Sequence, residues 1–394
     1  MVVPLIAVLT LHVDAGRLGL LRAVGQAPLL LFSLLAGAWA DRRDTRTIML
    51  LADACRALAL GGMAVIGLLG RLDVSMLLVV SFAIGALSVF FDVAYQAGVV
   101  ELVDRDLLVR GNSALEGSRS AAQSVGPAVG GALVSAFSAP VGAGFCAVFF
   151  AASFASIRRI RRRGPIPNRS ARRPRIGRQI HDGLREVLAD RSLRALALAS
   201  AAFQFSFAAL MTVYLLYLPR DLNASGATIG LALAATGPGA VLGSLLAARL
   251  PGRFGYGAVL VSAAAIGDGV FLCLPALHGP SGATVAVLVA VNLVFGLCSQ
   301  IVDVTLMAVR QAVTADGMQG RAAATITFIG MGLTPLGSLL GGYLGQEWGL
   351  RAGLLAAAFG ALISPVLIAF SPLARLGRAL NAPTRNAGSA QPSD

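Results

Sequence analysis

Residues 90–114, FFDVAYQAGVVELVDRDLLVRGNSA, align without a gap on residues 301–325, IVDVTLMAVRQAVTADGMQGRAAAT. Each stretch ends one apolar segment and begins the next, at the same place in each half of the chain. Such a repeat predicts two helical bundles related by an axis along the membrane normal, with a substrate path between them. The identical pairs include Asp92/Asp303, Val93/Val304 and Arg110/Arg321.

The composition of the chain is that of an integral membrane protein. Of its 394 residues, 56% are hydrophobic and 13% are charged, with a mean hydropathy of +0.77. A soluble domain carries roughly 25% charged residues. Apolar runs of about 18 residues or more, long enough to cross a bilayer, recur along the whole sequence. The four cysteines show no C-x-x-C spacing, so we expect packed thiols and neither a metal nor a cofactor.

The apolar runs predict eleven full membrane spans and one partial span. The partial span, 1–13, covers roughly 20 Å at 1.5 Å per residue, short of a hydrocarbon core of about 30 Å. We therefore expect the first span to be truncated, through a misassigned start or a shortened gene, and the intended number to be twelve. The full spans are predicted at 18–40, 47–70, 74–98, 112–137, 140–157, 193–217, 226–248, 256–276, 283–309, 321–345 and 351–371.

The distribution of arginine predicts the topology. All 32 basic residues are arginine; 25 fall in loops on one side of the predicted membrane, and the opposite loops carry four. Cytoplasmic loops are enriched in basic residues, so both termini and the long loop are predicted to be cytoplasmic. Topology also accounts for the net charge of +13, and we expect no nucleic-acid partner. The four exceptions are Arg17, Arg71, Arg220 and Arg351.

The chain divides into four predicted segments. Residues 1–157 form a six-span bundle, 158–192 an arginine-rich cytoplasmic linker, 193–372 a second six-span bundle and 373–394 a disordered tail. In the linker, an apolar face predicts an amphipathic helix at the membrane surface. That face comprises Ile176, Ile180, Leu184, Val187 and Leu188.

The loop after the first full span carries a family signature. GAWADRRDTR, residues 37–46, resembles G-x-L-A-D-R-x-G-R-K of the major facilitator superfamily, with Asp44 and Thr45 as departures. An acidic residue at the position of Asp44 is typical of a bacterial branch that includes enterobactin exporters and macrolide-efflux-like proteins. The stretches around 90, 112 and 310 resemble that branch too, so the likeness covers nearly the whole chain. The matching residues are Gly37, Ala40, Asp41, Arg42 and Arg46.

The resemblance implies an all-α, twelve-span major facilitator fold in the bacterial inner membrane, with both termini cytoplasmic. It also implies a cytoplasmic gate. The equivalent of Asp41 faces the positive N-terminal dipole of span eleven, and Arg42 and Arg46 offer donors to carboxylates such as Asp92. This network would clamp the two halves on the inside and break when the transporter opens inward.

A second signature lies in span five. SVGPAVGG, residues 124–131, resembles the antiporter signature G-x-x-x-G-P-x-x-G-G, with Ala122 in place of the first glycine, and in the family this signature accompanies exporters. Its small residues permit close helix packing, and its proline favours a kink. The residues concerned are Gly126, Pro127, Gly130 and Gly131. Span eleven holds a looser echo in Pro335, Gly337, Gly341 and Gly342.

Ionisable groups inside spans are the candidates for proton coupling, because burying them in a membrane is costly. Asp53 and Arg56, like Glu116 and Arg119, are spaced to pair on one helix, whereas Asp268 has no obvious local partner. Arg22 could attract an anion or extend toward the interface. Aromatic and amide side chains suit an amphipathic cargo. The cavity candidates are Gln26, Tyr95, Gln123, Phe203, Gln204, Phe207, Asn292, Gln300 and Phe328.

These features predict a secondary exporter of small amphipathic or hydrophobic molecules, of drug, macrolide or siderophore type, driven by proton antiport. Its partners would be the cargo, protons and the lipid bilayer, and we expect a monomer without enzymatic activity. Two other hypotheses stay open: a metabolite importer or uncoupled facilitator, and a non-transporting sensor or degenerate transporter. An ATP-driven pump is disfavoured because the sequence has no G-x-x-x-x-G-K-[ST].

Overall fold

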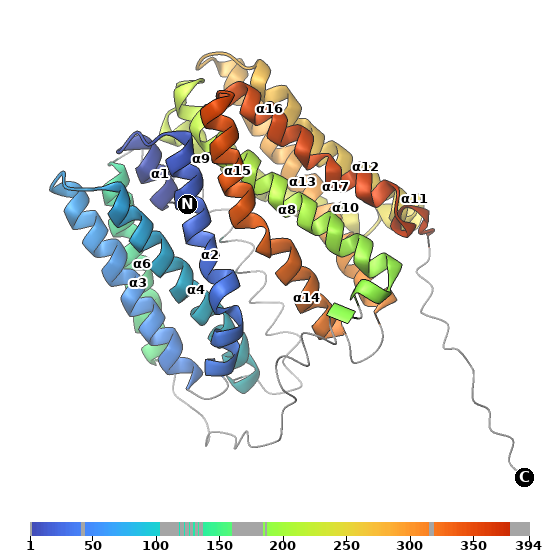
Figure 1. Ribbon diagram of the computed structural model, residues 1–394, viewed down its shortest axis with the longest axis horizontal. Helices are drawn as coiled ribbons and strands as arrows, with labels where there is room; N and C mark the ends of the chain where they lie inside the picture. The colour runs from blue at the N-terminus through green and yellow to red at the C-terminus, as the bar shows by residue number, and fades with distance from the viewer. Residues whose placement is uncertain are drawn as a thin grey trace, which may run out of the picture.

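The computed structural model describes residues 2–40, 44–102, 137–159, 187–314 and 319–378, with a few residues between 118 and 133 and residues 184 and 185. Within this part of the chain every regular element is a helix (Figure 1), which confirms the predicted all-α fold. Nine helices of the described residues are long and apolar enough to cross a membrane. Their limits lie within a few residues of the predicted ones, apart from α13, whose last turn runs on to Val313.

The helices fall into two groups along the chain. The first comprises α1 (Val2–Leu9), α2 (Ala15–Ala40), α3 (Thr45–Leu68), α4 (Val74–Leu102) and α6 (Ala139–Arg159). The second comprises α8 (Arg191–Arg220), α9 (Gly226–Ala234), α10 (Thr236–Ala247), α11 (Leu250–Phe254), α12 (Tyr256–Gly269), η2 (Val270–Ala276), α13 (Gly282–Val313), α14 (Gln319–Gly332), α15 (Thr334–Glu347), α16 (Leu350–Ala361), α17 (Ile363–Ala369) and η3 (Pro372–Arg375).

Four of the predicted spans are divided into two helices, one of them into α12 and η2. In the other three, the break lies close to a proline. Pro238, Pro335 and Pro365 lie at or just after the starts of α10, α15 and α17. Proline has no amide hydrogen and its ring clashes with the carbonyl four residues earlier, so the hydrogen-bond ladder of the helix is interrupted there.

Side-chain caps fix where several helices begin. The Asp190 carboxylate accepts from the backbone amides of Ser192 and Leu193 at 2.8 and 2.9 Å, at the start of α8. Ser225 and Ser281 cap α9 and α13 in the same way. Each cap satisfies amides that the helix itself leaves without an acceptor.

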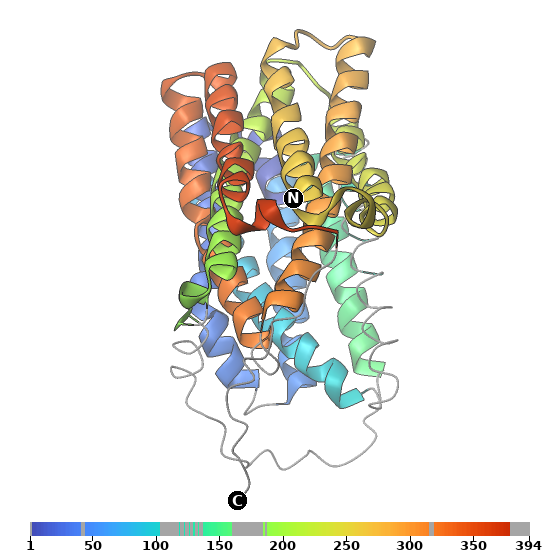
Figure 2. The same ribbon diagram turned by 90° about the vertical axis from the view of Figure 1, so that its right-hand side faces the viewer.

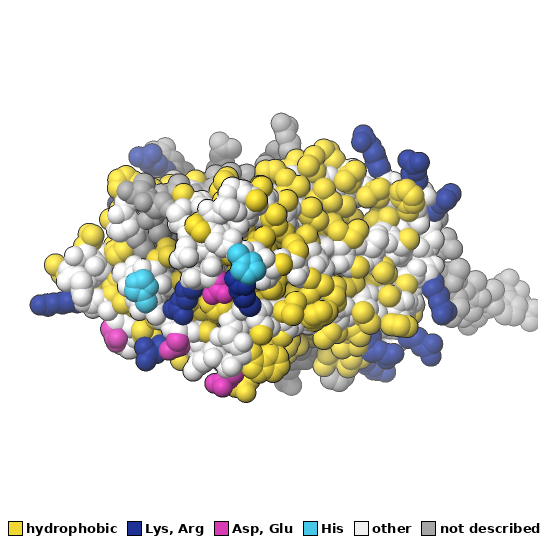
Figure 3. Space-filling view, turned by 90° about the horizontal axis from the view of Figure 1, so that it is seen from above, with side chains coloured by type: hydrophobic (Ala, Val, Ile, Leu, Met, Phe, Trp, Pro, Cys, Tyr) yellow, Lys and Arg dark blue, Asp and Glu magenta, His cyan; other side chains and the backbone are white. Residues whose placement is uncertain are grey.

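The two groups of helices stand side by side as two bundles (Figures 1 and 2). The arginine-rich end of the molecule is where α2 and α6 finish and α3 and α8 begin, low in Figure 1; the opposite end is at the top. Figure 3 shows a broad hydrophobic surface over the second bundle, between one group of charged side chains and a second group of arginines. Exposed hydrophobic side chains of the second bundle include Ile266, Phe359 and Phe370, as expected of helices that face lipid.

The bundles touch along α2 and α15, in the half of the molecule that includes the opposite end. A Cβ atom on Gly19 of α2 would lie 2.7 Å from the Ser338 carbonyl oxygen and 2.8 Å from the Cα of Gly342, both on α15. Backbones that approach so closely leave no space for side chains. Nearby, the Ser338 hydroxyl donates to Gln26 Oε1 at 3.1 Å. We call this contact the α2–α15 seam.

A second link between the bundles lies at the opposite end itself. The Arg220 guanidinium, at the end of α8, donates to the carbonyl oxygens of His12 and Val13 at 3.1 and 2.6 Å. Those carbonyls belong to the turn that precedes α2. The seam and this link together join the bundles on one side of the membrane.

The helix α15 packs closely on two of its faces. Gly337 and Gly341 of α15 lie against the carbonyl oxygens of Phe205 and Ala209 on α8. Gly342 lies on the other side, against α2. Glycines on two faces therefore let one helix pack closely against both bundles at once.

The seam can be tested by cross-linking in a variant whose four native cysteines are replaced. The Cβ of Ala15 lies 3.0 Å from the Cβ position of Gly345, within reach of a disulfide after a small shift. We expect Ala15→Cys/Gly345→Cys to cross-link readily in membranes, and Gly19→Val to slow this reaction. Gly62→Val is the control, because a Cβ there meets no described atom within 4 Å. Equal cross-linking rates in all variants would contradict the close contact of α2 and α15.

Candidate functional site

The family signature begins at the last turn of α2. Residues 41–43, which include Asp41 and Arg42, lie outside the described residues, as do the surroundings of Gly37. Asp44 is the N-cap of α3: its carboxylate accepts from the Arg46 amide at 3.2 Å and from the Thr47 hydroxyl at 2.9 Å. A carboxylate cap at this position gives a physical reason for the departure from glycine in the signature.

Arg46 binds within its own bundle. Its Nε donates to the Ile157 carbonyl oxygen at 3.3 Å and its Nη2 to the Arg158 carbonyl oxygen at 2.6 Å. Both acceptors lie at the end of α6, where carbonyls lack helical partners and the helix dipole favours a cation. Arg46 therefore ties α3 to α6, and the structure gives it these carbonyls in place of the expected carboxylate. Asp92 lies exposed on α4.

The antiporter-like signature of span five is described only in part. Gly126 and Gly130 are helical, and as far as the described atoms go each has room for a Cβ. Pro127, Gly131, Glu116, Arg119 and Gln123 lie outside the described residues. The roles predicted for this span stay predictions.

Asp53 and Arg56 form a buried ion pair in the first bundle. Arg56 Nη2 lies 2.6 Å from Asp53 Oδ1, with 6% and 1% of the two side chains exposed. Asp53 also accepts from the Ser153 hydroxyl of α6 at 2.6 Å, and the guanidinium donates to the Ser88 hydroxyl of α4 at 3.4 Å.

Two aromatic rings complete the surroundings of this pair. The Arg56 guanidinium carbon lies 4.4 Å from the ring centroid of Phe91 and 4.5 Å from that of Phe150, within the range of cation–π attraction. Asp53 and Arg56 thus join α3, α4 and α6 through bonds that use both charges. This geometry favours the structural interpretation of Asp53 over proton handling.

The second bundle contains a cavity of about 320 Å³. Its described walls come from α8, α12, α13, α14 and α17, and among the described lining residues none belongs to the first bundle. Two carboxylates face it: Asp268 from α12 and Asp303 from α13. No cationic side chain is among the described residues of the lining. Of the sequence-predicted candidates, Phe203, Gln204 and Asp268 meet at this cavity.

The two carboxylates differ in exposure. Asp268 is 5% exposed, and no hydrogen bond or ion pair joins it to another described residue. Asp303 is exposed, as is Met331 on the facing helix. The cavity therefore has an accessible carboxylate near its mouth and a buried one inside. Asp303 was not predicted from the sequence as a site residue. Its alignment with Asp92 in the internal repeat is the sequence feature that could have identified it.

The remaining predicted cavity residues lie apart from this site. Gln26 is at the seam. Tyr95 stacks on Phe91, with ring centroids 5.9 Å apart. Asn292 is buried and donates to the Tyr214 hydroxyl at 2.9 Å. Gln300 packs against Gly243 of α10, Phe207 stacks between Phe203 and Phe295, and Phe328 is 46% exposed on α14.

Arg22 lies on α2 within four residues of both Gly19 and Gln26. Its Nε is buried and has no hydrogen-bond partner among the described residues. Arg22 therefore lies on α2 next to the α2–α15 seam.

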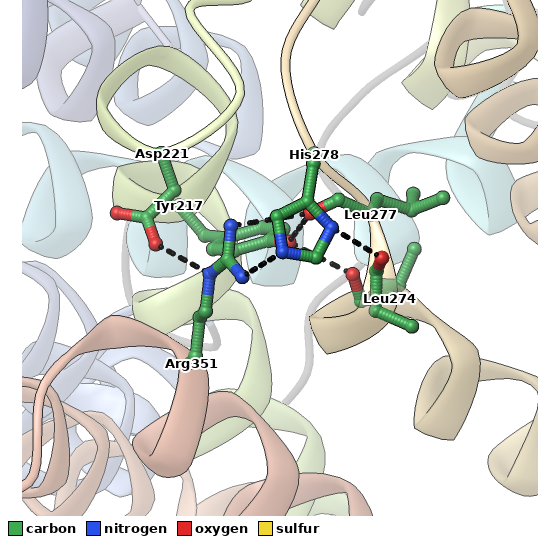
Figure 4. Close-up of polar contacts among 7 residues, drawn as sticks. Tyr217, Asp221, Leu274, Leu277, His278 and Arg351 are labelled. Atoms are coloured by element: carbon green, nitrogen blue, oxygen red, sulfur yellow. Dashed lines mark hydrogen bonds and ion pairs between the residues drawn. The ribbon is translucent and has the colours of Figure 1, made fainter.

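A polar network that sequence patterns did not reveal closes the second bundle at the opposite end (Figure 4). Arg351, at the start of α16, lies 3.2 Å from the Asp221 carboxylate and 2.6 Å from His278 Nε2. The Tyr217 hydroxyl donates to the carbonyl oxygens of Leu274 and Leu277 at 2.8 and 3.0 Å. These bonds tie α8, α16 and the loop after η2 together.

A comparison with known sequence profiles gives the family. The sequence profile of the transmembrane secretion effector family, a family of the major facilitator superfamily, matches residues 7–391. The chain belongs to this family. The chain is 27% identical over 371 residues to the multidrug efflux pump Tap of Mycobacterium tuberculosis, covering 88% of this chain and 82% of that one. Tap of Mycolicibacterium fortuitum is 26% identical, with 89% and 86% covered.

Solved structures with the same fold as this secretion effector are transporters. The nucleoside transporter NupG (D323A mutant) superposes with a TM-score of 0.74 at 12% identity over 93% of both chains. A bacterial homologue of the iron transporter ferroportin in the inward-facing state gives 0.71 at 15% identity over 92% of both. At these identities the likeness shows the fold alone, and it confirms the major facilitator architecture.

Removing one member of the buried pair should destabilise this family member strongly. We expect Asp53→Ala to cost roughly 3–5 kcal/mol, because Arg56 is left buried without its counter-charge. Loss of thermal stability of the purified protein, as a lower Tm, is the measurement. Arg17→Ala is the control, since the Arg17–Asp14 pair is 63% and 51% exposed, exposed pairs contribute little, and the Asp14 carboxylate still accepts from the backbone amide of residue 17. A similar Tm for both variants would show that the buried pair is not structural.

Proposed function

We propose that the protein is a secondary exporter of small amphipathic molecules that works by alternating access and proton antiport. The observation that carries the proposal is the seam, which joins the two bundles on one side of the membrane. Two bundles of a parallel repeat can expose a path between them to either side in turn when a contact of this kind opens and a contact at the other end closes. The relatives named multidrug efflux pumps support export as the direction.

The arginine-rich end is proposed to face the cytoplasm of a bacterial cell. The count of arginines on the two sides supports this orientation. The seam and the Arg220 link then lie on the outer side, and the conformation described would be open toward the cytoplasm. In that state an exporter loads its cargo.

Proton coupling is proposed to use the carboxylates of the second bundle. Asp53 is less suited, because its charge is satisfied by Arg56 and Ser153. Asp268 is free of such bonds among the described residues and is buried. An isolated buried carboxylate can take up and release a proton as its surroundings change.

Export can be tested in an efflux-deficient bacterium with a panel of dyes and antibiotics. We expect expression of the protein to lower their accumulation, and a protonophore to restore it, because the proton gradient drives antiport. Asp268→Asn should lose this gradient-driven export, and Glu347→Gln is the control for loss of an exposed acid at the opposite end. Export that persists after the gradient has collapsed would contradict proton antiport. Accumulation that the protein never lowers would contradict export itself.

A further inference from the structure

We infer that the cavity of the second bundle binds small aromatic or lipophilic organic cations, with Asp268 as their counter-charge. This inference deepens the proposed function, on which it rests, by naming a class of cargo. Four observations support it: the charge of the lining, the burial of Asp268, an aromatic wall and the size of the cavity.

The charge of the lining selects for cations. Asp268 and Asp303 are the ionisable groups among the described residues that line the cavity. The Cys298 thiol lies on α13 beside Gly267, whose Cβ would come within 2.7 Å of the Cys298 Cβ. With two acids and no described basic group in the lining, the local potential is negative, and low-dielectric walls strengthen it.

The burial of Asp268 favours the binding of a positively charged ligand beside it. Its side chain is 5% exposed and forms no hydrogen bond or ion pair with a described residue of the helices packed against it. A buried carboxylate without a partner is costly unless a counter-ion or a proton joins it. The first bundle shows the contrasting case, where Arg56 of the chain itself neutralises Asp53. At Asp268 the described part of the chain supplies no such counter-charge.

An aromatic wall favours an organic cation over a hydrated metal ion. Phe203 and Phe295 line the cavity, and both stack on Phe207 with ring centroids 5.3 and 5.1 Å away. Phe271 meets Phe295 edge-on at 5.0 Å and so extends the row. Aromatic faces attract cations, above all those that give up little hydration.

The size of the cavity sets the scale of the ligand. A volume of about 320 Å³ is at the small end of the range of ligand pockets, roughly 300–1,000 Å³. It suits a cation with one or two rings. Hydroxyl and amide groups of Ser200, Gln204 and Ser299 add hydrogen-bonding partners along one side.

The test uses two probes of matched shape and opposite charge. Full-length protein in nanodiscs of uncharged lipid is dialysed against 1-methyl-4-phenylpyridinium, a cation, or biphenyl-4-carboxylate, an anion. We expect the cation to bind and the anion not to bind. Binding of the cation should weaken as the pH falls, because protons compete for the same carboxylates. Equal binding of both probes, or of neither, would overturn the inference.

Variants locate the site. Asp268→Asn should lower the affinity for 1-methyl-4-phenylpyridinium about tenfold, the effect of about 1.4 kcal/mol, and should remove most of the pH dependence. Asp268→Glu keeps the charge and should keep most of the binding, which separates lost charge from misfolding. Phe203→Leu should lower the affinity about threefold, and Glu347→Gln should leave it unchanged. Unchanged affinity in Asp268→Asn would place the cation elsewhere and overturn the inference.

The binding and export experiments can fail independently, so they distinguish the inference from the proposed function. If the wild type exports dyes but binds the two probes alike, the inference is wrong and the exporter stands. If the cation binds through Asp268 but cells export nothing, the proposed function is wrong and the site stands.

Discussion

The close approach of α2 and α15 is the contact on which the arrangement of the two bundles depends. It exists because Gly19 and Gly342 meet backbone to backbone. Between two helices in a bilayer there is little hydrophobic driving force, so close van der Waals packing has to hold them. Glycine permits that packing, and α15 presents further glycines to α8 on its other side. One helix thereby packs closely against helices of both bundles.

The two bundles treat their buried acids differently. In the first, Asp53 and Arg56 satisfy one another and tie three helices together. In the second, Asp268 lies in a cavity without a counter-charge from the described chain. A transporter built this way has one bundle stabilised by a fixed ion pair. The other bundle holds a buried carboxylate, Asp268, which we propose pairs with either a proton or a bound cation.

Much of the fold followed from the sequence, because membrane spans need long apolar runs and loops carry arginine on one side. The limits of the spans could be predicted for this reason. The gapless repeat around Asp92 and Asp303 predicted two bundles. The helix breaks before Pro238, Pro335 and Pro365 could not be predicted from hydropathy, because they depend on the loss of backbone hydrogen bonds.

The site was harder to predict, since helix periodicity does not say which residues share a cavity. Asp268 was singled out for lacking a local partner, and Asp303 was overlooked. Arg46 was expected to bind a carboxylate, but the uncapped carbonyls at the end of α6 are its partners. A pattern along one helix cannot show the end of another helix that packs beside it.

Alternating access about the α2–α15 seam is the central claim, and paired distances test it most directly. Spin labels at 159 and 311 report the separation of the bundles at the arginine-rich end, and labels at 71 and 282 report it at the opposite end; all four positions are exposed. Pulsed electron paramagnetic resonance would follow both pairs as cargo and pH are varied. We predict that one distance shortens while the other lengthens. Distances that stay fixed, or that change together, would contradict alternating access in which the seam opens and closes.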